Sequence, residues 1–263
     1  MDREFRKGES IVEAQARWKL EDHRRELERR RQQIEAGRLR GELTKTRKKK
    51  RGEERKAERL IRNAKIEAER FAAIPIPSPI KYVPGNKKLS ILICSIRSRS
   101  RILQNLLVSL KKQIITKDIE ILVETDNKEI TIGVKRNILL RKALGDYITF
   151  IDDDDKISRD YICKILSAIS TFPDCCGIEG EISFRKRITR KFIHSIRYDR
   201  WFELNGIYYR CPNHLNPVRR EIASQVAFPN VSKREDEHYS LRIKPLLKTE
   251  VYIEGTIYFY GAD

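Results

Sequence analysis

The chain has 263 residues, of which 36% are charged, and its formal net charge is +18. This length suffices for one good-sized domain plus an appendage, and the basic balance favours anionic partners such as nucleic acid, nucleotide phosphates, acidic glycans or lipid headgroups. Five cysteines without a disulfide-like spacing, and an N-terminus without the apolar core of a signal peptide, predict a reducing, cytoplasmic location. No run approaches the roughly 18 apolar residues of a membrane-spanning helix.

Residues 1–72 are predicted to form a basic helical extension. Residues 1–70 hold 24 Lys and Arg against 15 Asp and Glu, a net charge of +9, and sparse apolar residues recur at helical spacing. The densest basic stretch lies within residues 38–59, where we expect contact with a polyanion. A solvated helix without a partner is the alternative interpretation.

The next segment, residues 73–87, is rich in proline, with Pro75, Pro77, Pro79 and Pro84. Proline lacks the N–H that helices and sheets require, so this segment is predicted to be an extended linker. It marks the boundary of a second domain over residues 88–263.

Short apolar runs then alternate with helical patterns. Strands are predicted at 89–95, 119–123 and 147–151, helices at 101–113, 133–144 and 160–171, and further strand-like runs at 177–184, 190–196 and 251–260. The order strand, helix, strand, helix, strand is typical of an α/β fold with parallel pairing.

Four consecutive carboxylates, Asp152 to Asp155, follow the third strand directly. Ligands of open α/β sheets bind just beyond the carboxyl ends of the strands. A hard divalent cation prefers oxygen ligands and relieves the repulsion among carboxylates, and Asp152 and Asp154 share a face if the backbone stays extended. The alternative is an acidic loop that caps the following helix, for which one Asp would suffice. We therefore predict a metal site that bridges to a diphosphate.

Polar side chains also follow the first two strands. Ser95, Arg97 and Arg99 offer hydroxyl and guanidinium groups to phosphates, and Asp126 offers a carboxylate to a nucleobase or ribose. Taken alone, these patterns are better explained as a basic loop and an ordinary Asp-Asn turn.

Taken together, the motifs resemble the nucleotide-binding half of family 2 glycosyltransferases. That family adopts the GT-A fold, a Rossmann-like, mostly parallel sheet flanked by helices. The resemblance covers about residues 88–260, and its closest form is the glycosyltransferase-like type often found in phage and other viral genomes. It rests on the order and spacing of Ser95–Arg99, Asp126-Asn127, Gly133–Asn137, Gly145–Asp155, Pro212–Arg219 and Arg234–Ser240.

The resemblance implies an inverting, metal-dependent transfer of a sugar from a nucleotide-diphosphate donor, most simply a UDP-sugar, to an acceptor hydroxyl. Asp152 and Asp154 would hold Mn²⁺ or Mg²⁺. Asp236 would be the general base, with Glu235 as the second candidate; without the resemblance, this charged run fits a solvated helix start. The donor-binding residues would be Ser95, Arg97, Arg99, Asp126, Lys135, Arg136 and Asp153.

The resemblance also places a proline-bracketed loop, with His214 and Asn216, on the acceptor side. A lone histidine serves equally well as a structural hydrogen-bonding group. Related sequences often carry a histidine near the end, where this chain has Phe259. We therefore expect that His214 or His238 replaces it, that Asp and diphosphate hold the metal alone, or that activity is lost.

The acceptor stays open among a glycan, a protein and modified DNA. Two other functions fit the basic extension. One is a non-catalytic nucleic-acid-binding protein, and the other is a glycosyltransferase that modifies hydroxylated bases while the extension holds the duplex.

Overall fold

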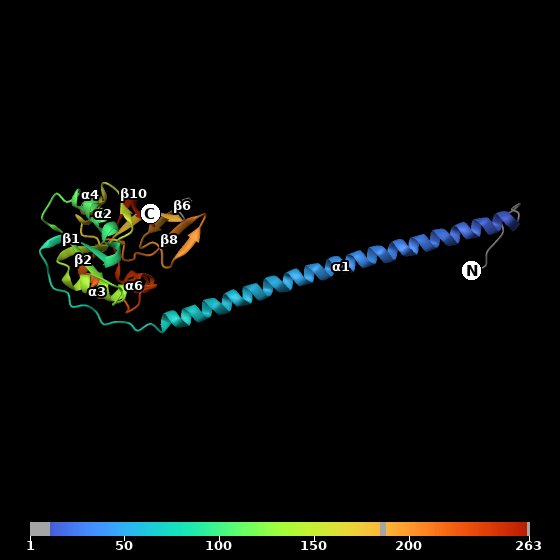
Figure 1. Ribbon diagram of the computed structural model, residues 1–263, viewed down its shortest axis with the longest axis horizontal. Helices are drawn as coiled ribbons and strands as arrows, with labels where there is room; N and C mark the ends of the chain where they lie inside the picture. Colours follow the sequence, from blue (N-terminus) through green and yellow to red (C-terminus); the bar gives the residue numbers. More distant parts are fainter. Residues whose placement is uncertain (1–10, 185–187, 262–263) are drawn as a thin grey trace. The chain divides into compact units, whose positions relative to one another are not determined.

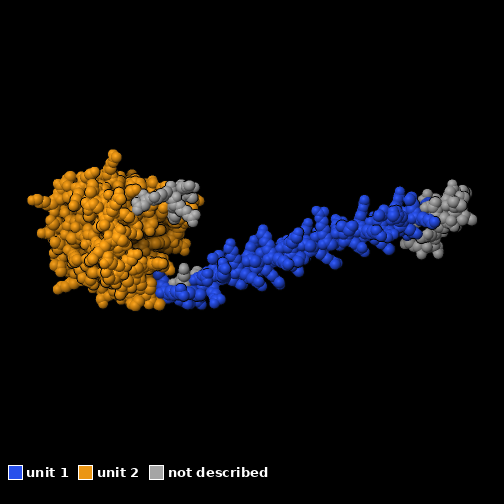
Figure 2. Space-filling model, in the orientation of Figure 1, with its two compact units in different colours: residues 1–72 blue, residues 73–263 orange. Residues whose placement is uncertain are grey.

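The computed structural model describes residues 11–184 and 188–261, and the chain divides into two compact units, residues 1–72 and 73–263 (Figures 1 and 2). The first ten residues of the predicted extension and the last two of the chain lie outside the described residues. Within the part that is described, no helix combines the length and hydropathy needed to cross a bilayer.

The predicted helical extension is confirmed as one helix, α1 (Ile11–Ala72), of 62 residues. A rise of 1.5 Å per residue makes it about 93 Å long. Its described side chains are largely exposed, including apolar ones such as Ile34 at 72%. Ion pairs one turn apart, such as Arg17 with Glu21 and Arg30 with Glu26, support the helix locally.

The second unit contains the predicted alternation of strands and helices, with a more varied second half. Its first half contains β1 (Lys87–Ile96), η1 (Arg97–Arg99), α2 (Ser100–Lys111), β2 (Ile119–Asp126), α3 (Ile132–Lys142), β3 (Gly145–Phe150), β4 (Lys156–Ile157) and α4 (Tyr161–Ile169). Its second half contains β5 (Cys175–Phe184), β6 (Ile188–His194), β7 (Phe202–Leu204), β8 (Ile207–Arg210), β9 (Val218–Arg219), α5 (Arg220–Ala223), α6 (Glu235–Ile243), η2 (Lys244–Leu246) and β10 (Glu250–Tyr260).

The described strands form one sheet in the order β2-β1-β3-β9-β5-β6-β8-β7, and β10 pairs with both β5 and β4. The pairs β1–β2, β1–β3, β5–β10 and β6–β8 are parallel. The short strand β9 runs antiparallel to both β3 and β5 and so joins the two halves. The predicted α/β fold, a mostly parallel sheet flanked by helices, is confirmed.

Two hydrophobic clusters cover the two faces of the sheet. Alternate residues of a strand point to opposite faces, so Tyr147 joins one cluster with α2 and α4, whereas Ile148 and Phe150 join the other with α3, α5 and α6. Because both faces are covered, β1 is mostly apolar from Leu89 to Cys94, and the buried hydroxyl of Ser90 within it donates to Glu120.

The proline-rich segment contains no helix or strand from residue 73 to 86, but it is not a free linker. Ile80 is buried, and its N–H donates to the carbonyl of Ser224 at 2.7 Å. Arg220 donates to the carbonyl of Val83 at 2.8 Å, and its guanidinium lies over the ring of Tyr82. The predicted linker therefore packs, for part of its length, as a strap on the second unit.

Candidate active site

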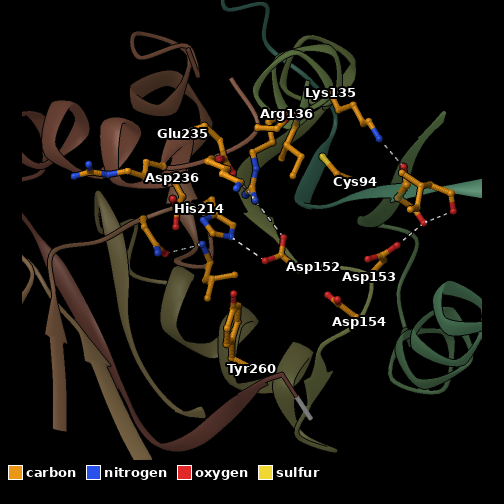
Figure 3. A pocket seen from close by; sticks show the side chains of 18 of the residues that line it. Cys94, Lys135, Arg136, Asp152, Asp153, Asp154, His214, Glu235, Asp236 and Tyr260 are labelled. Carbon is orange, nitrogen blue, oxygen red and sulfur yellow. Dashed lines mark hydrogen bonds and ion pairs between the residues drawn. The ribbon is translucent and has the colours of Figure 1, made fainter. Parts of the chain in front are cut away.

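A pocket of about 640 Å³ lies at the carboxyl ends of β1 and β3, beside the starts of α3 and α6 (Figure 3). Such a position is where α/β sheets bind ligands. Ten of the side chains predicted from sequence line it: Ser95, Arg99, Lys135, Arg136, Asp152, Asp153, Asp154, His214, Glu235 and Asp236.

The four consecutive aspartates differ in their surroundings. Asp153 is buried and accepts hydrogen bonds from Ser95 at 2.6 Å and from Arg99 at 2.9 Å. Asp155 points away from the pocket, where Tyr258 and the N–H of Gly261 donate to it. Asp152 and Asp154 keep partly exposed side chains, at 29% and 38%. Of the four aspartates, only these two combine partial exposure with a place in the pocket wall.

Arg136 holds the centre of this wall. Its Nη2 lies 3.1 Å from Asp152 and 3.4 Å from Glu235, so one buried guanidinium joins two carboxylates from distant segments (Figure 3). The guanidinium carbon lies 5.2 Å from the ring centre of Phe150 and 5.5 Å from that of Phe228, which is cation–π geometry. No hydrogen-bond partner for its Nε and Nη1 is found among the described residues.

His214 lies on the other side of Asp152, with 3.5 Å between its Nε2 and the carboxylate (Figure 3). Burial would raise the pKa of the Asp152 carboxyl, but His214 and Arg136 outweigh it and hold that pKa below its usual value. The pKa of Asp154 is instead raised, because burial and the neighbouring carboxylates outweigh Arg99. The pocket thus holds one firmly ionised carboxylate and one that a cation would stabilise.

Lys135 connects the ends of the first two strands. Its Nζ donates to the carbonyl of Ser95 at 2.7 Å and forms an ion pair with Asp126. Asp126 does not line the pocket itself, and it also accepts from the N–H of Ile130. Its carboxylate therefore positions Lys135 and the loop that leads into α3.

The two candidate bases begin α6. Glu235 is buried against Arg136, and burial raises the pKa of its carboxyl despite that contact. Asp236 is more exposed and lines the pocket, and its side chain makes no hydrogen bond or ion pair with any residue that the structure describes. The helix start is set by Arg234, whose φ of +62° is strained for a residue with a side chain.

The end of β10 corrects one expectation. Phe259 does not line the pocket, whereas Tyr260 does and is drawn there with Asp152 and Asp154 (Figure 3). Side chains alternate along a strand, so Tyr258 and Tyr260 share one face and Phe259 the other. A histidine at position 259 would therefore not line the pocket, whereas position 260 does. His214 is the histidine at Asp152, and His238 is buried outside the pocket wall.

Two further predicted residues do not reach the pocket. Arg97 is exposed in η1 and points elsewhere, and Asn216 is fully buried. Asn216 accepts from the N–H of Asn213 at 3.0 Å and donates to the carbonyl of Cys176 at 2.9 Å, so its amide fixes the loop that carries His214.

Several pocket residues were absent from the sequence prediction, among them Cys94, Trp201 and Arg210. Burial raises the pKa of the Cys94 thiol to about 12, which keeps it neutral. Arg210 and Trp201 flank a hairpin whose turn is Asn205-Gly206, both with positive φ. That dipeptide is a strong hairpin signal and would have placed these two side chains together.

Within residues 11–184 and 188–261, no group of three or more His, Cys, Asp and Glu side chains is arranged to hold a metal ion. The pocket instead offers two carboxylates, Asp152 and Asp154. This donor set fits a magnesium-like ion, which proteins hold through one or two carboxylates together with the phosphates of a substrate.

Fold and pocket together define an α/β protein with acidic and basic side chains at the ligand edge of its sheet. Glycosyl transferase family 2 is the family whose sequence model matches, over residues 127–227. That span contains α3, the four aspartates and His214, and ends before α6. Comparison with curated protein sequences gives no match.

Solved structures of S. aureus TarS share the fold. One aligns with a TM-score of 0.52 at 17% identity over 66% of this chain and 36% of TarS. The complex of TarS with UDP aligns with a TM-score of 0.52 at 18% identity, over 65% of this chain and 60% of that chain. The complex with UDP-GlcNAc aligns with a TM-score of 0.51 at 15% identity, over 65% of this chain and 58% of that chain. This chain thus spans well under two thirds of TarS. The family model thus matches part of the second unit, and the comparison with TarS shows a shared fold.

Proposed function

We propose that the pocket transfers a sugar from a nucleotide-diphosphate donor, a UDP-sugar, to an acceptor hydroxyl with inversion. One observation carries this proposal: the pocket brings the exposed carboxylates Asp152 and Asp154 together with Asp236, which comes from a helix more than 80 residues later in the sequence. The first pair suits the diphosphate end of a donor, and the third suits an acceptor hydroxyl.

On the donor side, Arg99 and Lys135 supply cations to the phosphates, and Asp152 and Asp154 would hold Mn²⁺ or Mg²⁺. When bound, such an ion stabilises negative charge on the leaving diphosphate. Arg136 keeps Asp152 ionised and oriented, and Ser95 fixes Asp153 within the wall. The similarity to TarS, which has been solved with UDP, supports a uridine nucleotide.

On the acceptor side, Asp236 would accept the proton of the attacking hydroxyl. An inverting transfer needs a base on the side of the sugar opposite the leaving group. Asp236 suits this role better than Glu235, because Glu235 is buried against Arg136 while the carboxylate of Asp236 lines the pocket without a partner among the described residues.

Binding of UDP is expected to be strengthened by Mn²⁺, and replacing Asp154 with alanine is expected to remove that increment. The carboxylate of Asp154 is 38% exposed, so its loss removes a metal ligand without leaving a buried charge unpaired. Calorimetric titration of UDP with and without Mn²⁺, and after chelation, measures the effect. Asp160→Ala, an exposed aspartate outside the pocket wall, is the control. Absence of UDP binding in both conditions would refute the proposed function.

A second candidate function, polyanion binding by α1, has one specific observation in its favour. Six of the seven residues in 45–51 are Lys or Arg, and no ion pair to them is found in the described part of the chain. Seven residues make about two turns, so these charges surround the helix on all sides. Such a surface suits a nucleic acid, with or without transfer of sugar to a modified base.

Replacing Arg47, Lys48, Lys49 and Lys50 with glutamine should weaken double-stranded DNA binding and lower its dependence on salt. Each lost phosphate contact reduces the slope of log K against log salt by about 0.9. The matched control replaces Arg24, Arg25, Arg29 and Arg31 of the same helix, where glutamates are interspersed. Filter binding at several salt concentrations measures both slopes. Equal slopes in the two variants would remove the special role of residues 45–51.

A further inference from the structure

Arg210, at the end of β8, is the unusual cation of the pocket. Four arginines line the wall, and three of them have carboxylate partners: Arg99 with Asp153 and Asp154, Arg136 with Asp152 and Glu235, and Arg234 with Glu237. Arg210 makes no ion pair and no side-chain hydrogen bond with any residue that the structure describes. Its guanidinium carbon instead lies over aromatic rings, 4.4 Å from the ring centre of Trp201 and 5.9 Å from that of Tyr208.

This arrangement leaves a half-buried positive charge without compensation. Burial lowers the pKa of Arg210, and the nearby carboxylate of Asp236 opposes that effect only from a distance. A guanidinium stays charged at all ordinary pH values, and burying a charge without a partner is unfavourable. An anion that enters the pocket would supply the missing partner, in the forked geometry that guanidinium groups favour.

Aromatic rings hold Arg210 ready for such a contact. The indole N–H of Trp201 donates to Ser240 at 3.1 Å, which fixes the ring beneath the guanidinium. Tyr208 is fixed in turn by Arg190, whose Nη1 lies 3.2 Å from its hydroxyl. Because cation–π contacts leave the N–H groups of a guanidinium free at its edge, these donors remain available to a ligand.

The position of Arg210 separates it from the donor side. In the sheet, β8 lies beyond β5 and β6, whereas β1, β2 and β3 carry the predicted donor site at the other end. Among charged groups, the carboxylate of Asp236, the proposed base, has the largest effect on the pKa of Arg210. Arg210 therefore lies on the side of the pocket where the attacking hydroxyl is expected.

We propose that the acceptor carries an anionic group, a phosphate or a carboxylate, and that Arg210 binds it beside Asp236. This inference rests on the proposed function, because it assigns the chemical class of the acceptor for the same site. Arg210 is then a residue that determines specificity, and a neutral acceptor of the same size would leave its charge unpaired.

Fluorescence of Trp201 reports on this contact directly. The chain has two tryptophans, so the Trp18→Phe background leaves Trp201 as the single emitter, with Arg210 over its ring. Glycerol 3-phosphate and glucuronate are titrated against their neutral counterparts, glycerol and glucose. We expect a saturable change with the two anions and none with the neutral pair.

Replacing Arg210 with glutamine is expected to weaken anion binding by at least about tenfold, the effect of one charge-assisted hydrogen bond. Arg210→Lys keeps the charge but loses the fork and should fall in between. The matched control is Arg197→Gln, which removes another arginine from an aromatic ring, that of Tyr252, and lies outside the pocket wall. If Arg210→Gln and Arg197→Gln behave alike, the inference is wrong.

Calorimetric titration of UDP on the same proteins separates this inference from the proposed function. We expect UDP affinity to be unchanged in Arg210→Gln, and the anion to bind equally well when UDP is saturating. If UDP displaces the anion, or if Arg210→Gln weakens UDP as much as the anion, Arg210 belongs to the donor site and the inference is overturned. If UDP does not bind at all, the proposed function fails and the acceptor assignment falls with it.

Discussion

Replacing Asp236 with asparagine is expected to lower kcat by about 10²- to 10⁴-fold, the usual contribution of a general base. Asparagine keeps the size of the side chain but cannot accept a proton from the acceptor hydroxyl. Because Asp236 has no partner among the described residues, its replacement should leave both the fold and the affinity for UDP unchanged. Released UDP, measured at saturating donor and acceptor, gives kcat, and calorimetry gives the affinity.

Two neighbouring glutamates make this test specific. Glu237→Gln removes a carboxylate from the same turn of α6, but Glu237 pairs with Arg234 and does not line the pocket, so kcat should be retained. Glu235→Gln removes the second candidate base. If Glu235→Gln abolishes turnover while Asp236→Asn retains it, the roles of the two residues are reversed.

Replacing Arg136 with methionine is expected to lower the free energy of unfolding by about 3–5 kcal/mol, the usual cost of removing one partner from a buried ion pair. Methionine still packs between Phe150 and Phe228, but Asp152 and Glu235 then face each other without the cation that joins them. Urea unfolding, followed by the fluorescence of Trp201, measures the loss.

The double variant Arg136→Met with Glu235→Gln should recover part of that stability, since it removes one of the two uncompensated charges. Arg141→Met is the control, because Arg141 is an exposed arginine of the same helix. An Arg136→Met protein as stable as the wild type would show that the guanidinium does not hold the two segments together.

The first three strands could be predicted from the sequence because each is a short, mostly apolar run of strand-forming residues, and β1 and β3 are largely buried. Polar residues mark the carboxyl ends of these strands, where the apolar runs stop. This located Ser95, Asp126 and the four aspartates near one edge of the sheet. Each of these strands can be recognised locally, since its own residues define it.

The rest of the site depends on contacts between distant segments. The buried guanidinium of Arg136 contacts Phe228 and Glu235, which lie more than 90 residues later in the sequence, and no local pattern indicates those contacts. The choice of Tyr260 over Phe259 depends on the register of β10, which contains irregularities in its pairing with β5. A shift of one residue in a strand reverses every side chain.

The last described strand, β10, also determines when the pocket can form during synthesis. Tyr258 in this strand accepts from the N–H of Asp152 and donates to Asp155, contacts that span more than 100 residues of sequence. A nascent chain that has left the ribosome only as far as α6 would hold the donor-side strands but leave β5 without its parallel neighbour. Contacts of such long sequence separation form late and slowly. The acidic wall can therefore become ordered only after β10 has left the ribosome, and interruption of translation before residue 258 would leave Asp152 and Asp155 without the hydroxyl that joins them.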